Sequence, residues 1–500
     1  MKKKKDEQII EKHPEDEIKP MHLEGHRPVT RRDFLSQGFL GMSALVMMPT
    51  FGSLLTSHAF AAGCDDGPSL DPLTPTIIID LAGGAAMAGS NFMVGKQGGQ
   101  LDLLNGYEGL GLPPDFHPSK ANMLNTEMGI AFHGDSGFLR GIKQVTSAAT
   151  RQKIDGTVFC GRTADDTGNN EQNPIFWLHK AGAAGELVQI AGTSSKGGSG
   201  GNSKPPGSSI NKSVAPVILN SSQDALNLVS VGKLNGFTTS NSALKRDKVF
   251  SAIAELSRNK LDSAPTGSLS EKLRQVISCG YDKTGEQIKK FSPDALDPRL
   301  DPDVTAVFGS DLPSDGERHK AATLSKLVLD GYIGVATILM SGYDYHDGKR
   351  STGEKRDLVA GQIIGRIFEL AARKKKNVVI IVITDGAVST NRVADSSEDG
   401  RGKFNWTGDA SVNTSSAMMV YQHAGRPSMR SQKRQVGYFK ANGSIETSAL
   451  NISNSPVNLA KLFVANYLAL HGMEGKLAEV VGDNPFQSEL DKYLMFDRLI

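Results

Sequence analysis

The hydrophobic pattern of the chain is clearest between residues 332 and 384. Two runs, 332–340 (YIGVATILM) and 377–384 (NVVIIVIT), are apolar at nearly every position, which is typical of strands buried on both faces of a sheet. Between these runs Val359, Ile363 and Ile367 recur at four-residue spacing and predict a helix. Because a strand, a helix and a second strand follow one another, we expect a parallel pair of strands joined by a right-handed crossover.

A capping box marks the expected start of the helix between these strands. Ser351 and Glu354 have the required spacing, and the basic stretch RKKK suits the negative end of a helix dipole, so we expect the helix to span about 354–375. A shorter helix is expected in ATLSKLVLDG, just before the first strand, with Gly331 ending it.

Strand and helix patterns also occur towards both ends of the chain. The stretch TIIIDLAGG (76–84) predicts a strand that runs into a glycine-rich turn. Ser455 and Pro456 begin a predicted helix that closes at Gly472, and its inward residues are Leu459, Leu462 and Phe463. The alternation of buried strands and amphipathic helices predicts an α/β fold, with a mostly parallel sheet covered by helices on both faces.

The middle of the chain is less regular. Residues 249–291 predict two helices, the second beginning at a capping box of Ser268 and Glu271, and residues 192–212 predict a flexible loop rich in Gly and Ser. This loop lacks the spacing of a phosphate-binding loop. The connector 291–304 could bind calcium, but it lacks the spacing of a calcium loop, and turn chemistry accounts for its aspartates, which are Asp294, Asp297, Asp301 and Asp303.

The N-terminal segment predicts export. Arg31 and Arg32 precede a moderately apolar stretch and then small residues, which is the layout of a twin-arginine signal. We therefore expect a signal peptide with an extended n-region over 1–61, a linker over 62–75 and a single domain over 76–485. The expected partner is the twin-arginine translocase, and the expected location is periplasmic or exported.

The segment 34–55 is long enough to cross a bilayer, but several polar, Gly and Pro residues dilute it, so we expect no permanent membrane span. Two processing sites compete. Cleavage after Ala61 suits an ordinary signal peptidase, whereas AAGC, ending at Cys64, resembles a lipoprotein box and would give a lipid-anchored protein. The other cysteines, Cys160 and Cys279, could pair in an oxidising compartment or stay separate buried thiols.

The net charge of the chain bears on whether it binds nucleic acid. The net charge of the 500 residues is +2, and much of the basic excess lies in MKKKK at the start. Nothing therefore points to a nucleic-acid groove.

Candidate chemistry follows the two apolar strands. Asp344 and His346 come just after the first strand and Asp385 directly after the second, and parallel strands present their ends at one edge of a sheet. Two carboxylates and an imidazole can bind zinc or manganese, and a carboxylate-rich edge can also hold magnesium or calcium. The alternative is that these residues are the polar ends of strands and cap the turns that follow.

Several motifs together resemble a large bacterial family of twin-arginine-exported proteins of unknown function that is distantly similar to alkaline phosphatases and sulfatases. The motifs are TRRDFL, IIIDLAGG, VFCGRTADDTGNNEQNP, LVLDGYIGVATILMSGYDYHD and NVVIIVITDGAVST. The resemblance implies an alkaline-phosphatase-like fold. The family's Gly-x-Asp-x-His falls on Gly342, Asp344 and His346, its acidic residue after the next strand on Asp385, and a later aspartate on Asp409.

The chain also departs from that family. It reads GGAAMAGSN where the family has an aspartate after the glycine turn, Asn-Asn-Glu at 169–171 where it has Asn-Asn-His, and GDAS where it has Asp-His-Gly, so the histidine after Asp409 is missing. A two-metal cluster needs several Asp and His ligands, so the resemblance implies a single site at most. Possible nucleophiles are Ser90, Cys160 and Thr163, and no neighbouring sequence selects one of them.

Three functions follow from this pattern. The first is an exported α/β protein with a reduced site that binds a metal or an anion with little or no catalysis. The second is an active metal-dependent hydrolase of phosphate or sulfate esters, whose missing ligands come from residues such as His133, Asp135 or His423. The third is a non-enzymatic envelope or secretion component that uses the Gly/Ser-rich loop for interaction.

Overall fold

The structure is a computed structural model that describes residues 73–163, 171–193, 205–212, 214, 216–228, 255, 259, 293–312, 316–448 and 452–499. The expected signal segment, including Arg31, Arg32 and Cys64, lies outside the described residues. So do Cys279, the capping box of Ser268 and Glu271, nearly all of the segment 249–291, and part of the Gly/Ser-rich loop.

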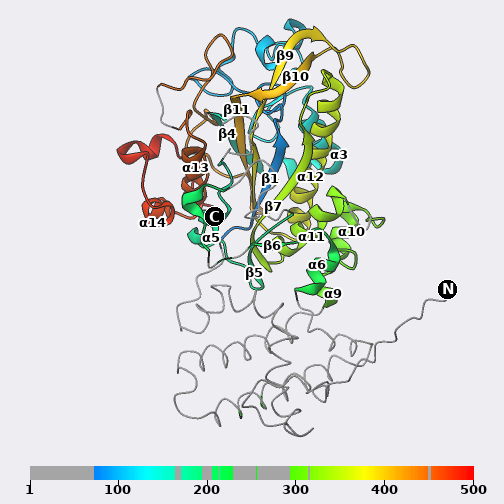
Figure 1. The fold of residues 1–500 in the computed structure, drawn as a ribbon, viewed down its shortest axis with the longest axis vertical. Helices are drawn as coiled ribbons and strands as arrows, with labels where there is room; N and C mark the ends of the chain where they lie inside the picture. Colours follow the sequence, from blue (N-terminus) through cyan, green and yellow to red (C-terminus); the bar gives the residue numbers. More distant parts are fainter. Residues whose placement is uncertain are drawn as a thin grey trace, which may run out of the picture.

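An eight-stranded sheet forms the centre of the described chain (Figure 1). Only β11 runs antiparallel to its neighbours, β4 and β8, and every other pairing in the sheet is parallel. In spatial order the strands are β12 (Gln435–Val436), β4 (Ile154–Arg162), β11 (Asn413–Tyr421), β8 (Val378–Thr384), β1 (Thr76–Gly83), β7 (Ile333–Tyr343), β5 (Val188–Gly192) and β6 (Val217–Ile218). The prediction of a mostly parallel α/β sheet is confirmed.

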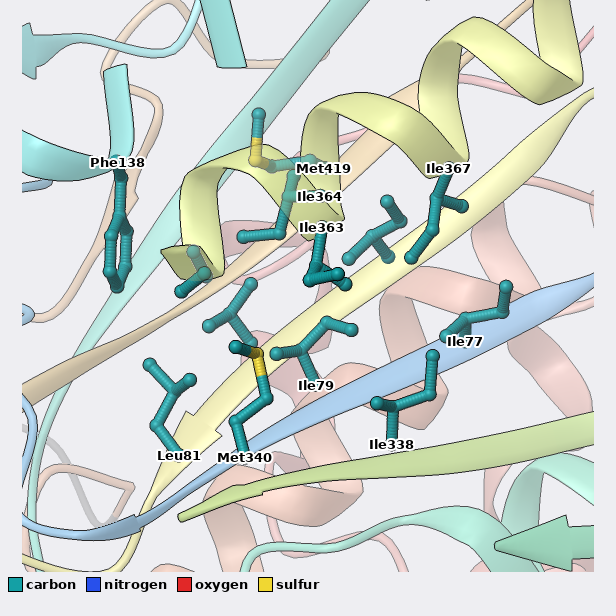
Figure 2. Close-up of a cluster of buried hydrophobic side chains, with 14 of the residues drawn as sticks. Ile77, Ile79, Leu81, Phe138, Ile338, Met340, Ile363, Ile364, Ile367 and Met419 are labelled. Carbon is teal, nitrogen blue, oxygen red and sulfur yellow. The ribbon is translucent and has the colours of Figure 1, made fainter. Parts of the chain in front are cut away.

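Helices cover both faces of the sheet, as expected (Figure 1). One face packs against α3 (Gly137–Val145), α10 (Pro302–Phe308), α11 (Glu317–Leu329) and α12 (Arg350–Arg373), and the other against α5 (Ile175–Ala181), α13 (Pro456–Ala469) and α14 (Leu477–Val481). Along β1 the side chains alternate between the two layers, with Ile77 and Ile79 in one and Ile78 in the other. Figure 2 shows the first layer, where Ile363 and Ile367 of α12 lie in one cluster with Ile77 and Ile79 of β1.

The two apolar strands predicted from the sequence are parallel and in one sheet, but they are not adjacent. β1 lies between β7 and β8, pairing Ile79 with Ile338 on one side and with Val382 on the other. The strand that separates them comes from about 250 residues earlier in the chain, so the sequence near the helix gives no sign of it. Helix α12 joins β7 to β8 and packs through Ile363 and Ile367, as expected.

Helices α3 and α12 lie so close that glycines are required between them. A β-carbon at Gly361 would lie 2.2 Å from the Phe138 carbonyl oxygen, and one at Gly141 would lie 2.2 Å from the Leu358 carbonyl oxygen. The two helices therefore pack with their backbones in contact, which holds α3 against α12.

The predicted capping box at the start of α12 is wrong. The helix begins at Arg350, so Ser351 lies inside its first turn, and Glu354 is buried among charged side chains. The Ser351 N–H instead donates to the Asp395 carboxylate at 3.0 Å. Asp395 comes from a segment distant in sequence, so this cap could not be found by local spacing.

Other local signals hold. Ser455 caps α13 by accepting from the Asn458 N–H, and Gly331 follows α11 with a φ of 81°. In the aspartate-rich connector, Asp301 caps α10 and pairs with Lys326 and Lys374. Turn and cap chemistry therefore accounts for Asp301.

The remaining elements are short. The two small ribbons are β2 (Leu124–Asn125) with β3 (Phe132–His133), and β9 (Ala387–Ala394) with β10 (Phe404–Ser411). The remaining helices are α4 (Ala148–Arg151), α6 (Ser222–Asn227), α9 (Pro293–Leu296), η1 (Glu108–Leu110), η2 (Pro114–Phe116), η3 (Gly207–Ser209), η5 (Glu474–Lys476) and η6 (Gln487–Lys492). Buried residues continue to Phe496, beyond the expected domain end at 485. No helix within the described ranges is long and apolar enough to cross a membrane.

Candidate functional site at the carboxyl edge of the sheet

The candidate site lies where β1, β7 and β8 end together. In the register Leu81 lies beside Met340 on one side and Thr384 on the other. Gly83 then approaches β7 so closely that a β-carbon there would lie 2.5 Å from the Tyr343 carbonyl carbon, and its φ is 122°. Only glycine fits this position. The three strand ends therefore form one edge; the sequence predicted this for the ends of β7 and β8.

Asp385 lies inside this edge rather than on its surface. Its side chain has no exposed surface, and Oδ1 accepts a hydrogen bond from the Gly83 N–H at 2.9 Å. Beside it the Thr384 hydroxyl accepts from the Ala85 N–H at 2.9 Å. Buried N–H groups need such partners, so Asp385 and Thr384 hold the glycine-rich turn that follows β1.

The residues after β7 alternate between the interior and solvent. Tyr343 and Tyr345 are fully buried, with ring centroids 6.1 Å apart, whereas Asp344 and His346 are exposed. This is the two-residue period of an extended chain. It places the carboxylate and the imidazole on one side of the segment and both phenols on the other.

Asp344 and His346 contact each other through Oδ1 and Nε2. Their side chains are 55% and 65% exposed, so both are open to solvent. An imidazole and a carboxylate in contact can share a proton or take part in binding a borderline cation. The structure thus brings these two candidates together and leaves Asp385 buried beneath the neighbouring turn.

Asp409 lies in β10, in the ribbon that follows β8. Its neighbours Gly408 and Ala410 pair with Ser389 and Ala387, so its backbone is near the chain that leaves Asp385. Figure 1 shows this ribbon beyond one end of the central sheet.

The described residues contain no group of three or more His, Cys, Asp or Glu side chains placed to hold a metal ion. The donors at the edge are chemically suited to a divalent cation, but the accessible set consists of Asp344 and His346. A set of two fits one loosely held ion and does not fit a two-metal cluster. Metal binding by Asp344, His346, Asp385 and Asp409 stays a prediction.

The three possible nucleophiles are all buried. The Ser90 hydroxyl donates to the Leu110 carbonyl at 2.8 Å, and the Thr163 hydroxyl donates to the Ser411 carbonyl at 3.4 Å. Cys160 is a free thiol with no exposed surface, and burial raises the pKa of this thiol. A raised pKa keeps the thiol protonated and a poor nucleophile.

The alternative ligands also have other places in the fold. His133 is buried, donates from Nε2 to the Phe116 carbonyl at 2.8 Å and accepts from the Asp135 N–H at Nδ1. His423 follows β11, whose last residue, Tyr421, pairs with Val378 at the start of β8. His423 therefore lies at the amino edge of the sheet, about 20 Å along a seven-residue strand from Asp385.

A buried charge network under the start of α12 was not predicted from the sequence. Glu354 accepts from Arg350 at 2.9 Å, from Lys403 at 2.7 Å and from Arg140 at 3.0 Å, and Lys403 also contacts Asp135 at 3.2 Å. Burial alone would raise the pKa of Glu354, but the charges of Lys403 and Arg350 hold it below its usual value. The network ties α12 to α3 and to the β9–β10 ribbon.

Asp357 extends this network on the same face of the helix. Its Oδ2 accepts from the Asn91 side-chain amide at 2.7 Å, and Asn91 in turn accepts from the Ser136 hydroxyl. Burial, and next the negative charge of Glu354, raise the pKa of Asp357 to about 7. This carboxyl therefore titrates near neutral pH although it has almost no contact with solvent.

One sequence signal could have revealed the network. Arg350, Glu354 and Asp357 are in helical phase with the buried positions Gly361, Ile364 and Phe368, at spacings of three and four. Charged residues that continue an apolar stripe are expected to be buried with partners.

No family model, curated protein or solved structure matched this chain in comparisons with known proteins. Membership of the twin-arginine-exported family stays a prediction from the motifs. The case for a function therefore rests on the geometry of the edge and on the residues that surround it.

Proposed function

We propose that this chain is an exported α/β protein of alkaline-phosphatase-like architecture whose carboxyl edge binds a divalent cation weakly, with little or no ester hydrolysis. The observation that carries the proposal is the exposed contact between Asp344 and His346 directly after β7. Ligand sites of parallel α/β sheets lie at this edge.

The two side chains have defined parts in the proposal. A carboxylate oxygen of Asp344 and Nε2 of His346 would hold the ion, and water would complete its coordination. A bound cation acts as a Lewis acid and lowers the pKa of bound water. Tyr343 and Tyr345 anchor the segment from the buried side, since the Tyr343 hydroxyl donates to the Arg356 carbonyl at 3.0 Å.

Little catalysis is expected because the other parts of a hydrolase site have other roles. Asp385 supports the Gly83 turn, and the hydroxyls of Ser90 and Thr163 are buried and bonded to carbonyls. An efficient hydrolase of this kind needs a positioned nucleophile and a preorganised charge cluster.

The test compares the wild type with Asp344→Asn and His346→Ala. We expect weak zinc or manganese binding by the wild type in calorimetry, loss of it in both variants, and background hydrolysis of phosphate and sulfate esters throughout. Asp115→Asn, which changes an exposed carboxylate elsewhere, is the control and should bind as the wild type does. Ester hydrolysis that disappears in Asp344→Asn would establish the active hydrolase instead, and a wild type without metal binding would make the pair structural.

Export is tested separately. Changing Arg31 and Arg32 together to Lys should keep the protein in the cytoplasm, because twin-arginine transport depends on that pair. Normal export of the double variant would remove this part of the proposal. The mass of the mature N-terminus distinguishes cleavage after Ala61 from a diacylglyceryl group on Cys64.

A further inference from the structure

A cavity of ≈ 240 Å³ lies away from the candidate site, near the amino ends of β4 and β12. It is lined by four segments of the chain, which supply Gln100 and Leu101; Thr126, Gly129 and Ala131; Arg426; and Gln432 to Arg434. Arg434 directly precedes β12, and Asp155, the second residue of β4, lies beside the cavity. Because β4 runs in the same direction as β8, this is the edge opposite to Asp344.

The lining carries three cations and no acidic side chain. Among the described residues, only Arg434 has a carboxylate partner that offsets its charge. Arg434 pairs with both oxygens of Asp155 at 2.9 Å, and Asp155 also accepts from the Gly156 N–H. Asp155 is buried against Gly129, where a β-carbon would lie 2.2 Å from its carboxyl carbon. The charge of Asp155 is therefore offset by Arg434 and does not neutralise the other two cations.

The other two cations have no carboxylate partner within the described part of the chain. Arg426 donates from Nε to the Gln152 carbonyl and from Nη2 to the Glu127 carbonyl, which leaves both N–H groups of Nη1 and one of Nη2. The Lys433 ammonium forms no hydrogen bond or ion pair with any described residue, whereas its backbone is fixed, because its carbonyl accepts from the Gln100 N–H at 3.0 Å. Both side chains are exposed, so the recess has two positive charges that no described carboxylate offsets, on a backbone that the Gln100–Lys433 hydrogen bond holds in place.

The nearby carboxylate of Glu127 does not supply the missing charge. It pairs with Arg151 at 2.7 Å and with Lys143 at 3.2 Å. A cation that lacks a counter-charge attracts an anion from solution, and the attraction is stronger in a recess than on an open surface.

The donors select the shape of the anion. Arg426 has five N–H groups and gives two of them to carbonyls, so three remain, on Nη1 and Nη2. The ammonium of Lys433, the remaining guanidinium N–H groups of Arg426 and the hydroxyl of Thr126 together suit an anion with several oxygens arranged around one atom. A phosphoryl dianion matches both this arrangement and the two spare charges.

We propose that this cavity binds a phosphoryl group, as inorganic phosphate or as a small phosphate monoester. The volume of ≈ 240 Å³ corresponds to about eight waters at roughly 30 Å³ each. It therefore accepts a phosphoryl group together with a few further atoms. Lys433 and Arg426 supply the charge, and Arg434 with Asp155 forms a fixed wall.

The test is calorimetric titration of the full chain with inorganic phosphate, glycerol 3-phosphate and acetate at low ionic strength. We expect both phosphates to bind, acetate to bind much more weakly, and added salt to weaken phosphate binding. Tighter binding of the ester than of inorganic phosphate would identify an esterified ligand, and equal binding would identify free phosphate.

Lys433→Gln is the main variant, because it removes the charge without breaking any contact of the side chain. It should weaken phosphate binding about tenfold, in the range of one lost charged hydrogen bond. Arg426→Gln should weaken binding similarly, with its fold checked by circular dichroism. The control, Lys120→Gln, removes an exposed lysine outside the cavity and should change nothing.

Asp344→Asn separates this inference from the proposed function. It should abolish metal binding at the carboxyl edge and leave phosphate binding unchanged. A wild type that binds neither phosphate at millimolar concentration would overturn the inference, as would a Lys433→Gln variant that binds as the wild type does.

Discussion

In its first two turns helix α12 buries Arg350, Glu354 and Asp357, whereas its later turns bury Ile364 and Phe368 on the same face, with Ile363 and Ile367 beside them. The charged first half and the apolar second half lie on one helix face, but they are stabilised differently. The apolar half gains free energy from area removed from water, which does not depend on one particular partner. In the charged half each group is stable only while its partners remain. One buried face of a helix can therefore contain residues that tolerate other apolar side chains and residues that need particular charged partners.

The largest effect is expected in the apolar half. Ile363→Asp places an unpaired charge in the core between α12 and the sheet and should cost several kcal/mol, which is enough to unfold many domains with a total stability of about 5–15 kcal/mol. Urea unfolding or soluble yield measures this. Ile363→Val is the control and should cost about 0.5–1.5 kcal/mol. A stable Ile363→Asp protein would show that this part of the helix is not packed as described.

The next effect is expected in the charged half. Glu354→Gln leaves Arg350 and Lys403 buried with a neutral partner and should cost about 3–5 kcal/mol, the range for breaking a buried ion pair. Glu398→Gln, at an exposed position in the β9–β10 connection, should be close to neutral in the same unfolding experiment. Equal stability of the two variants would mean that the network contributes little.

A smaller, pH-dependent effect is expected at Asp357. Burial and Glu354 raise its pKa to about 7 from an ordinary value of 3.8. Between these values the folded chain holds a proton that the unfolded chain has lost, so the contribution of Asp357 to the free energy of unfolding falls as pH rises and levels off above about pH 7.

The variant Asp357→Asn removes this term, and its amide oxygen can still accept from Asn91. We expect the difference in stability between variant and wild type to shift in favour of the variant from pH 5 to pH 8, measured by urea unfolding. The comparison must be made as a difference, because buried His133, whose pKa is lowered to about 4 by burial, contributes in the opposite direction below pH 6.5. A difference that does not change with pH would place the Asp357 pKa outside this range.

The smallest effect on stability is expected just before the helix. Asp344→Asn and His346→Ala change exposed groups, and each should alter the free energy of unfolding by no more than about 0.5–1 kcal/mol. Thermal unfolding checks this. A much larger loss would show that the pair supports the fold and would weaken its assignment as a binding site.

Local sequence patterns predicted much of this architecture. The strands at β1, β7 and β8, the long helix with Ile363 and Ile367 inward, and the cap at Ser455 follow from period and spacing, because each depends on residues near one another in the chain. The closeness of Asp344 and His346 follows from their spacing of two in an extended segment. The meeting of the β7 and β8 ends at one edge follows from their parallel direction, whereas the end of β1 between them was not predicted.

Tertiary structure alone decided the rest. It placed β1 between β7 and β8, supplied Asp395 as the cap of α12, and turned Glu354 from an expected cap into the centre of a charge network. It also buried Asp385 under Gly83 and placed Lys433 at a cavity where no described carboxylate pairs with it. The physical reason is common to all five. Whether a polar group is buried, paired or exposed to solvent depends on segments that meet only after folding. The spacing of residues along the chain does not identify those segments.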